Sequence, residues 1–189
     1  MLAKIAPVLE QYNLSTAEGK LGWVQKEPLE IYVDTYRSMF WENLTPVNQV
    51  FSDFVLSIDI TWASKMGFAV CGLMFLAEKD LQNGEQYQFN TLRLSGAPAW
   101  DVEFWEFNDW QYTATGDVRY NNAISLKDNS TNHYVLIYKD NLLTIYANDV
   151  RLGNVDVSKR NQGIFGALTW QDSGETTCIF SNGWIWSLK

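Results

Sequence analysis

The sequence predicts an all-β protein, built as a two-sheet antiparallel β-sandwich or jelly roll. Aromatic residues make up 15% of the 189 residues, and they suit a pleated, half-buried surface. Ten or more short apolar or alternating runs are separated by turn residues, and no helical pattern is evident beyond residues 2–12. We expect residues 1–14 to form an N-terminal helix or linker and residues 15–189 to form one sandwich domain.

Two runs in the first half show how the strands should be buried. "FVLSIDITW" (54–62) alternates between apolar and mostly polar positions, which predicts a strand with one buried face. "GFAVCGLMFLA" (67–77) is apolar on both faces and predicts a central strand that is covered on both sides. The short polar link "ASKMG" between them predicts an antiparallel hairpin.

The second half continues as strands joined by tight turns. "YQFNTLRL" (87–94) is one strand, and "HYVLIYK" and "LLTIYA" lie on either side of Asp140-Asn141, a hairpin signal. Asn148-Asp149 makes the next turn. "GIFGALTW" (163–170) and "TTCIFSNGWIWSL" (176–188) close the chain, and Gly183 inside the last run predicts a β-bulge.

Charge excludes some partners. The net charge of −8 and pI of about 4.6 would repel nucleic acid and anionic membranes, whereas a neutral glycan remains compatible. We therefore expect no nucleic-acid partner and no membrane insertion, since no apolar run could span a bilayer. The apolar patch at residues 5–9 is too short for a signal-peptide core, which leaves the compartment open.

Residues that could carry metal or redox chemistry are few. Cys71 and Cys178 each lie in an apolar run and are expected to be buried free thiols; a disulfide would require their strands to be neighbours in an oxidising compartment. His133, the sole histidine, is expected at the surface. Residues 127–132 and 154–156 offer oxygen atoms to Ca²⁺, but neither matches a calcium loop, so we predict no cofactor and no metal site.

Several motifs together carry a family resemblance. They are an early Asp-Phe-x-Leu strand (53–56), a hairpin from Leu143 to Asn148, a Gly163–Gly166 strand, and a terminal pattern of Phe180, Asn182, Trp186 and Leu188. From residue 15 onward the chain resembles the concanavalin A-like lectin/glucanase superfamily, especially its laminin-G-like and 3-keto-disaccharide hydrolase-type domains. The resemblance implies two stacked sheets, a concave face that binds glycans in relatives, and an extracytoplasmic location. Many relatives have an arginine where this chain has Leu76, and the shared fold alone does not settle function.

The stretch "WDVEFWEFNDW" (100–110) is the main candidate site. On a regular strand Trp100, Val102 and Phe104 share one face and suit the core, whereas the opposite face mixes rings with carboxylates. The stretch is compatible with a glycosidase active site, a sugar-stacking platform or an ordinary strand.

The catalytic interpretation rests on three carboxylates. Asp101, Glu103 and Glu106 imitate the Glu-x-Asp-x-x-Glu spacing of superfamily glucanases, which brings two carboxyls together across a glycosidic bond. The match is imperfect, because Asp stands first and Glu stands in the middle. Glu106 should also point away from the other two unless a bulge intervenes. A hydrolase would need these groups to converge, with Asp59 or Glu78 as further candidates.

The binding interpretation uses aromatic and acidic side chains together. A ring stacks on the C–H face of a sugar while a carboxylate accepts its hydroxyl hydrogens. The candidate ligand-binding residues are Trp105, Asp101, Glu103, Trp110 and Tyr112. Our leading hypothesis is a non-catalytic carbohydrate-binding or adhesion-type domain. The alternatives are a glycoside hydrolase and a structural or protein-interaction module, so the expected partner is a glycan or a protein surface.

Overall fold

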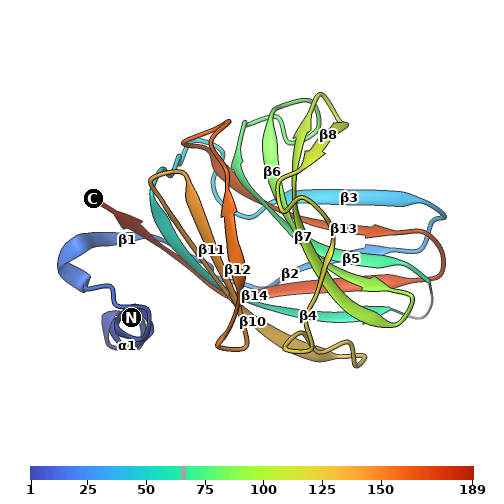
Figure 1. Cartoon of the computed structure of the whole chain (residues 1–189), viewed down its shortest axis with the longest axis horizontal. Coiled ribbons are helices and arrows are strands. Elements are labelled where there is room, and N and C mark those ends of the chain that lie inside the picture. Colours follow the sequence, from blue (N-terminus) through green and yellow to red (C-terminus); the bar gives the residue numbers. More distant parts are fainter. Residues whose placement is uncertain (65–66) are drawn as a thin grey trace.

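The computed structural model describes residues 1–64 and 67–189 as two seven-stranded antiparallel sheets that face each other (Figure 1). Sheet A has the order β1 (Gly19–Val24), β14 (Thr176–Leu188), β4 (Phe54–Ser64), β10 (Ser130–Lys139), β11 (Leu142–Ala147) and β12 (Val150–Asp156), with β2 (Leu29–Val33) also paired to β14. Sheet B has the order β3 (Ser38–Asn43), β13 (Ile164–Gln171), β5 (Ala69–Ala77), β6 (Gln86–Leu94), β7 (Ala97–Glu106) and β8 (Asp109–Thr113), with β9 (Arg119–Tyr120) paired to β7. The predicted all-β sandwich is confirmed.

The main hydrophobic core lies between the two sheets. Strand β4 contributes the five apolar residues that the alternation places on one face: Phe54, Leu56, Ile58, Ile60 and Trp62. Strand β5 is buried along all nine of its residues, as its apolar run predicts. Both faces of the strand are buried because one packs into the core and the other packs against a second hydrophobic cluster on the outer face of sheet B.

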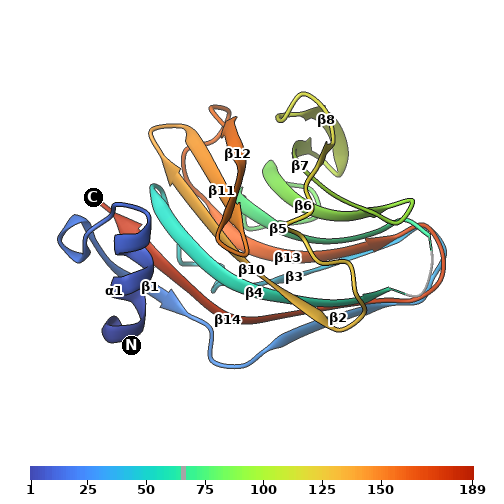
Figure 2. The same cartoon turned by 60° about the horizontal axis from the view of Figure 1, so that its bottom comes forward.

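Helix α1 (Leu2–Gln11) covers part of the outer face of sheet A (Figure 2). Its apolar side buries Ile5 and Leu9 against Val55 and Trp184. A short 3₁₀ helix, η1 (Thr16–Glu18), then leads into β1, and Ser15 caps it through a capping box with Glu18. The helices in the described part of the chain are too short or too polar to cross a membrane.

The turns follow their local chemistry. Asp140 and Asn141 join β10 to β11 with φ values of 52° and 65°, and Asn148 and Asp149 join β11 to β12 with 48° and 66°. Two consecutive positive φ values are typical of the type I′ hairpin turn, in which Asn and Asp are tolerated. The predicted bulge at Gly183 is confirmed, because the register of β14 against β4 shifts between Ser181 and Trp184.

The expected hairpin between residues 54–62 and 67–77 is wrong. Strand β4 pairs with β10 and β14 in sheet A, whereas β5 pairs with β6 and β13 in sheet B. Residues 65 and 66 of the connecting link lie outside the described residues. A polar link indicates that a strand ends, but it does not specify which sheet receives the next strand, and here the chain crosses the sandwich.

The expectation of free thiols is also wrong. Cys71 of β5 and Cys178 of β14 form a disulfide, with their Cα atoms 5.7 Å apart. The two residues are 107 positions apart in the sequence, so only the assembled sandwich brings their inward faces together. The bond therefore joins sheet B to sheet A through the middle of the core.

Replacing both cysteines (Cys71→Ala together with Cys178→Ala) should lower the free energy of unfolding by about 2–5 kcal/mol, because the bond closes a long loop in the unfolded chain. Urea unfolding measures the loss. Reductant should shift the wild-type midpoint toward that of the double variant and leave the variant unchanged. Equal midpoints for the oxidised wild type and the variant would contradict this assignment.

A candidate functional site on the outer face of sheet B

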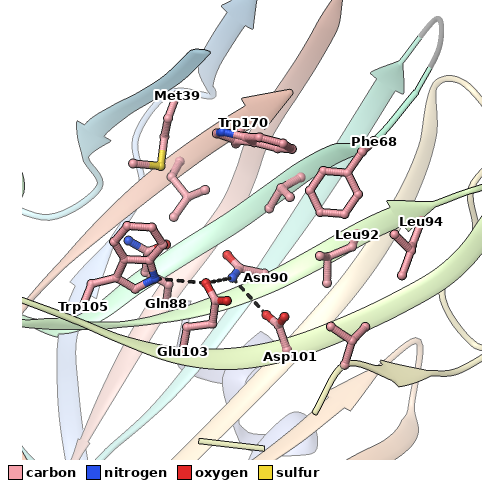
Figure 3. A pocket seen from close by; sticks show the side chains of 13 residues that line it. Met39, Phe68, Gln88, Asn90, Leu92, Leu94, Asp101, Glu103, Trp105 and Trp170 are labelled. Atoms are coloured by element: carbon pink, nitrogen blue, oxygen red, sulfur yellow. Dashed lines mark hydrogen bonds between the residues drawn. The ribbon is translucent and has the colours of Figure 1, made fainter. Parts of the chain in front are cut away.

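A pocket of about 520 Å³ lies on the face of sheet B that is turned away from sheet A (Figure 3). Strands β3, β5, β6, β7 and β13 contribute side chains to it, and segments next to β5 and β9 complete its rim. The thirteen lining residues are Met39, Phe68, Val70, Gln88, Asn90, Leu92, Leu94, Asp101, Glu103, Trp105, Val118, Leu168 and Trp170.

Alternation along β7 divides the candidate stretch between core and pocket. Trp100, Val102 and Phe104 are buried in the main core, as predicted. The intervening residues Asp101, Glu103 and Trp105 line the pocket. Successive side chains of a strand point to opposite faces, so the burial of the first set directs the second set outward.

Strand β6 places two amides beside these carboxylates. Its inward residues, Tyr87 and Phe89, pack in the core, and its outward residues Gln88 and Asn90 line the pocket. In the register of β6 with β7, Gln88 lies opposite Glu103 and Asn90 lies opposite Asp101. Directly opposite residues are close enough for their side chains to interact.

Gly72 of β5 makes room for the Asn90 amide. It is the partner of Asn90 on the other side of β6, and a Cβ atom added to it would lie 2.8 Å from Asn90 Oδ1. A side chain here would push Asn90 out of its position. The position of the Asn90 amide thus depends on this glycine.

Hydrogen bonds tie the two carboxylates to one donor group (Figure 3). Asn90 Nδ2 donates to Asp101 Oδ1 at 2.9 Å and to Glu103 Oε2 at 3.1 Å. Trp105 Nε1 also donates to Glu103 Oε2, at 3.0 Å. The two acceptor oxygens that share Asn90 therefore lie about 6 Å apart at most.

The remaining oxygens of both carboxylates are available to a ligand. Within the described residues, Asp101 Oδ2 and Glu103 Oε1 accept no hydrogen bond, yet neither is sealed away from solvent. By contrast, Asn90 Oδ1 and Gln88 Nε2 are buried and have no partner there. Such unpaired polar atoms are costly in a folded protein, and a ligand that bonded to these two amides would remove part of this cost.

Burial perturbs the protonation of both acids. Desolvation raises the pKa of Asp101 to about 7; the negative charge of Glu103 adds to the shift, and the hydrogen bond from Asn90 opposes it. Desolvation also raises the pKa of Glu103, against the hydrogen bonds from Trp105 and Asn90. Neighbouring carboxylates in a poorly hydrated site hold protons more tightly because neither ionised form is well solvated.

Aromatic rings form the walls of the pocket. Trp105 lies at one side of the pocket. Trp170 and Phe68 lie together on the other side, with their ring centroids 4.7 Å apart (Figure 3). The other lining residues are mostly aliphatic, and among the described residues the lining contains no lysine, arginine or histidine. Apolar walls around a few convergent polar groups are typical of small-molecule sites.

The remaining predicted residues of the stretch lie outside this lining. Glu106 ends β7 opposite Asp109. Trp110 of β8 pairs in register with Trp105 and is half exposed beyond the pocket. Tyr112 lies on the core side, where its hydroxyl oxygen is 3.3 Å from that of Tyr87. A register shift next to Trp105 separates the faces of Trp110 and Tyr112.

The further carboxylates considered for hydrolysis are elsewhere too. Asp59 lies on sheet A, where its two oxygens bond to His133 Nδ1 at 2.7 Å and to Asn182 Nδ2 at 2.8 Å. Glu78 follows β5 and pairs with Arg160 at 3.2 Å. Of the acids named in the sequence, the structure brings only Asp101 and Glu103 together in the pocket.

The suggested calcium segments are engaged in turn chemistry. Asp128 Oδ1 accepts from the backbone N–H of Ser64, Asn132 Oδ1 accepts from that of Ser125, and Asn154 Oδ1 accepts from Arg151. Among the described residues, no three His, Cys, Asp or Glu side chains gather where they could hold a metal ion.

Sequence reasoning missed several lining residues, notably Gln88, Asn90, Phe68 and Trp170. A signal for the two amides existed, because they alternate with aromatic residues in "YQFNTLRL" and therefore share a face. Phe68 and Trp170 carried no comparable signal, because their approach depends on the pairing of β5 with β13.

Comparison with known structures agrees with this architecture. The carbohydrate-binding module CBM66 from Bacillus subtilis superposes with a TM-score of 0.62 at 18% identity, over 90% of this chain and 96% of that chain. A Bacillus subtilis protein of unknown function with a galectin-like fold gives 0.61 at 11% identity, over 89% and 87%. A prokaryotic β-1,3-1,4-glucanase (lichenase) from a mouse hindgut metagenome gives 0.56 at 7% identity, over 88% and 83%.

The fold is therefore a concanavalin A-like jelly-roll sandwich, as the sequence resemblance implies. No protein-family model matches the chain, and no curated protein matches it by sequence. Identities this low establish the fold and leave the function to the chemistry of the site.

Asp101→Asn should change the pH dependence of stability. Because the pKa of Asp101 is raised from near 4 in the unfolded chain to about 7 in the fold, the folded state holds the extra proton between these values, and stability falls as pH rises through them. Asparagine cannot ionise, so the variant should gain about 2–4 kcal/mol relative to the wild type between pH 4 and pH 8. Denaturant midpoints across this range measure the gain. Glu106→Gln, which removes an acid outside the pocket, serves as the control, and a pH-independent difference for Asp101→Asn would contradict the assignment.

Proposed function

We propose that the chain is a non-catalytic carbohydrate-binding domain that takes a sugar in the pocket on sheet B. The observation that carries the proposal is the juxtaposition in one cavity of aromatic walls and two carboxylates, each with an oxygen that accepts no hydrogen bond from the described residues. Its volume of about 520 Å³ is within the range of small-molecule sites.

Each part of the lining has a role in this proposal. The apolar face of a pyranose or furanose ring packs on Trp105 or Trp170, since sugar C–H groups are attracted to the faces of aromatic rings. Sugar hydroxyls donate to the free oxygens of Asp101 and Glu103, and hydrogen bonds to ionised acceptors are stronger than neutral ones. The aromatic faces supply most of the contact area, and the acids fix the orientation of the ring.

A glycoside hydrolase is the second candidate, and the spacing of the two acids favours it. Retaining enzymes hold two carboxyls about 5–5.5 Å apart, which the shared bond to Asn90 allows. Asp101, with its pKa raised to about 7, would act as the general acid and Glu103 as the nucleophile. Against this, both acids are bonded to one amide instead of lying on either side of an open cleft. Release of reducing ends from a bound glycan would favour the hydrolase.

An adhesion or protein-interaction role would use a different surface. Phe107, Trp110 and Tyr120 are exposed large aromatics outside the pocket lining. Binding to a protein that depends on these residues and is indifferent to Asp101 would favour this alternative over a sugar site.

We also infer an extracytoplasmic location for the domain. The buried disulfide between Cys71 and Cys178 supports it, because such bonds form and persist in oxidising compartments and are rare in reducing ones.

Trp105→Ala should abolish or greatly weaken glycan binding. A glycan array identifies a ligand for the wild type, and calorimetry with that ligand should show a loss of at least about 30-fold, since truncating a central aromatic anchor costs about 2 kcal/mol or more. Trp105→Phe keeps a ring but removes the N–H donor to Glu103, so its affinity should be intermediate.

Trp110→Ala provides the matched control, because it removes a tryptophan from the next strand but outside the pocket. It should bind as the wild type does. The proposal fails if no glycan binds the wild type, or if Trp110→Ala weakens binding as much as Trp105→Ala does.

A further inference from the structure

Resting on the sugar-binding function proposed above, we propose that the pocket on sheet B prefers a sugar that carries a free, protonated amino group over neutral and anionic sugars. Three features of the described part of the pocket lead to this preference: negative charge without a positive partner in the lining, two carboxylate oxygens that accept no hydrogen bond, and aromatic walls.

Among the described residues that line the pocket, none offers a positive charge to the acids. Asp101 and Glu103 are the only titratable side chains in this described lining, and Asp101 is only 2% exposed. The nearby arginines of β6 and β9 are engaged elsewhere: Arg93 donates to the carbonyl of Ser64, and Arg119 lies over the Trp100 ring, 5.4 Å from its centroid, and donates to a backbone carbonyl. Buried carboxylates without a compensating charge are unfavourable, and a cationic ligand relieves this cost.

The described donors of the pocket also do not reach every carboxylate oxygen, although the amide nitrogen of Gln88 in the lining is itself unpaired among these residues. The two acids accept from Asn90 Nδ2 and Trp105 Nε1 only, which leaves Asp101 Oδ2 and Glu103 Oε1 without a donor among the described residues. A hydroxyl group brings one donor and no charge. An ammonium group brings three donors and a full positive charge, so it can bond to both acids at once. An anionic sugar would add negative charge beside two acids whose ionised forms are already poorly solvated.

The walls distinguish an organic ammonium from a metal ion. Calcium takes six to eight oxygen ligands. The described lining leaves at most four side-chain oxygens for one ion, one from each acid and one from each of the amides Gln88 and Asn90, because Asn90 Nδ2 occupies the other carboxylate oxygens. Trp105, Trp170 and Phe68 instead present aromatic rings, whose faces attract ammonium groups and pack on a sugar ring. The same cavity therefore suits both parts of an amino sugar.

Three tetrasaccharides with the same β-1,4-linked backbone test the preference by calorimetry at pH 6: the glucosamine tetramer, the N-acetylglucosamine tetramer and cellotetraose. They differ at carbon 2 of each sugar residue, which carries an ammonium, an acetamide or a hydroxyl group. We expect the glucosamine tetramer to bind with one-to-one stoichiometry and at least about tenfold more tightly than either of the others.

Proton release on binding gives a second measurement. It would not be observed if Asp101 had only a structural role. At pH 6 the free protein holds a proton on Asp101, because burial raises its pKa to about 7, and an ammonium bound beside it should expel that proton. The heat of binding the glucosamine tetramer should therefore change with the ionisation enthalpy of the buffer, and this change should vanish in Asp101→Asn.

Acid-to-amide variants distinguish binding by the two acids of the pocket from general attraction to the net charge of the protein, which is −8. Asp101→Asn and Glu103→Gln should each reduce the preference for the glucosamine tetramer to threefold or less, whereas Glu106→Gln, outside the pocket, should retain it. A preference that survives both pocket variants would come from surface attraction and would overturn the inference.

Failure of this inference is distinguishable from failure of the proposed function. If cellotetraose or the N-acetylated tetramer binds as tightly as the glucosamine tetramer, with dependence on Trp105, the amino-group preference is overturned and the sugar site stands. If none of the three binds, the preference is overturned, and the glycan array decides whether the sugar site stands.

Discussion

The burial of one face of each inner strand between the two sheets is the constraint on which the rest of the structure depends. In β7, Trp100, Val102 and Phe104 lie in this core, so the two-residue period of the strand directs Asp101 and Glu103 to the opposite face. A slip of one residue would bury both carboxylates in the core and expose three large apolar side chains. The packing energy of the sandwich thus fixes the register of the candidate site, although none of the described lining residues belongs to the main core between the sheets.

The same constraint explains why the acids tolerate their surroundings. Strand pairing places Asn90 directly opposite Asp101 and Gly72 directly opposite Asn90, so an amide donor lies between two carboxylates at the point where a neighbouring side chain is missing. The amide donates to one oxygen of each acid, and in the described part of the chain the other oxygen accepts no hydrogen bond. These hydrogen bonds offset only part of the cost of burying the two carboxylates, and the pKa values of both acids are therefore raised. The empty site therefore retains an unfavourable desolvation energy. A ligand with a positive charge and enough hydrogen-bond donors would remove this energy on binding.

The sequence predicted local and periodic features well. The alternation in 54–62, the two-sided burial of 67–77, the Asn-rich turns and the split of residues 100–105 between two faces all follow from side-chain period and turn chemistry, which are read within a few residues. The features that the sequence did not predict correctly depend on contacts between distant segments. The sheet to which β5 belongs, the pairing of Cys71 with Cys178 and the approach of Trp170 to Phe68 depend on contacts between segments far apart in the chain, and no local pattern specifies those.

The disulfide is a contact between distant segments that supports a site formed by local strand patterns. Cys71 points into the core between the two outward-facing residues of β5 that bear on the site: Val70, which lines the pocket, and Gly72, on which the Asn90 amide rests. The bond to Cys178 therefore anchors the floor of the pocket to the opposite sheet at the strand that sets the position of Asn90. A binding site gains affinity when its polar groups are held in place before the ligand arrives, because less freedom is lost on binding. The covalent link that stabilises the sandwich thus also holds the donor on which both acids depend.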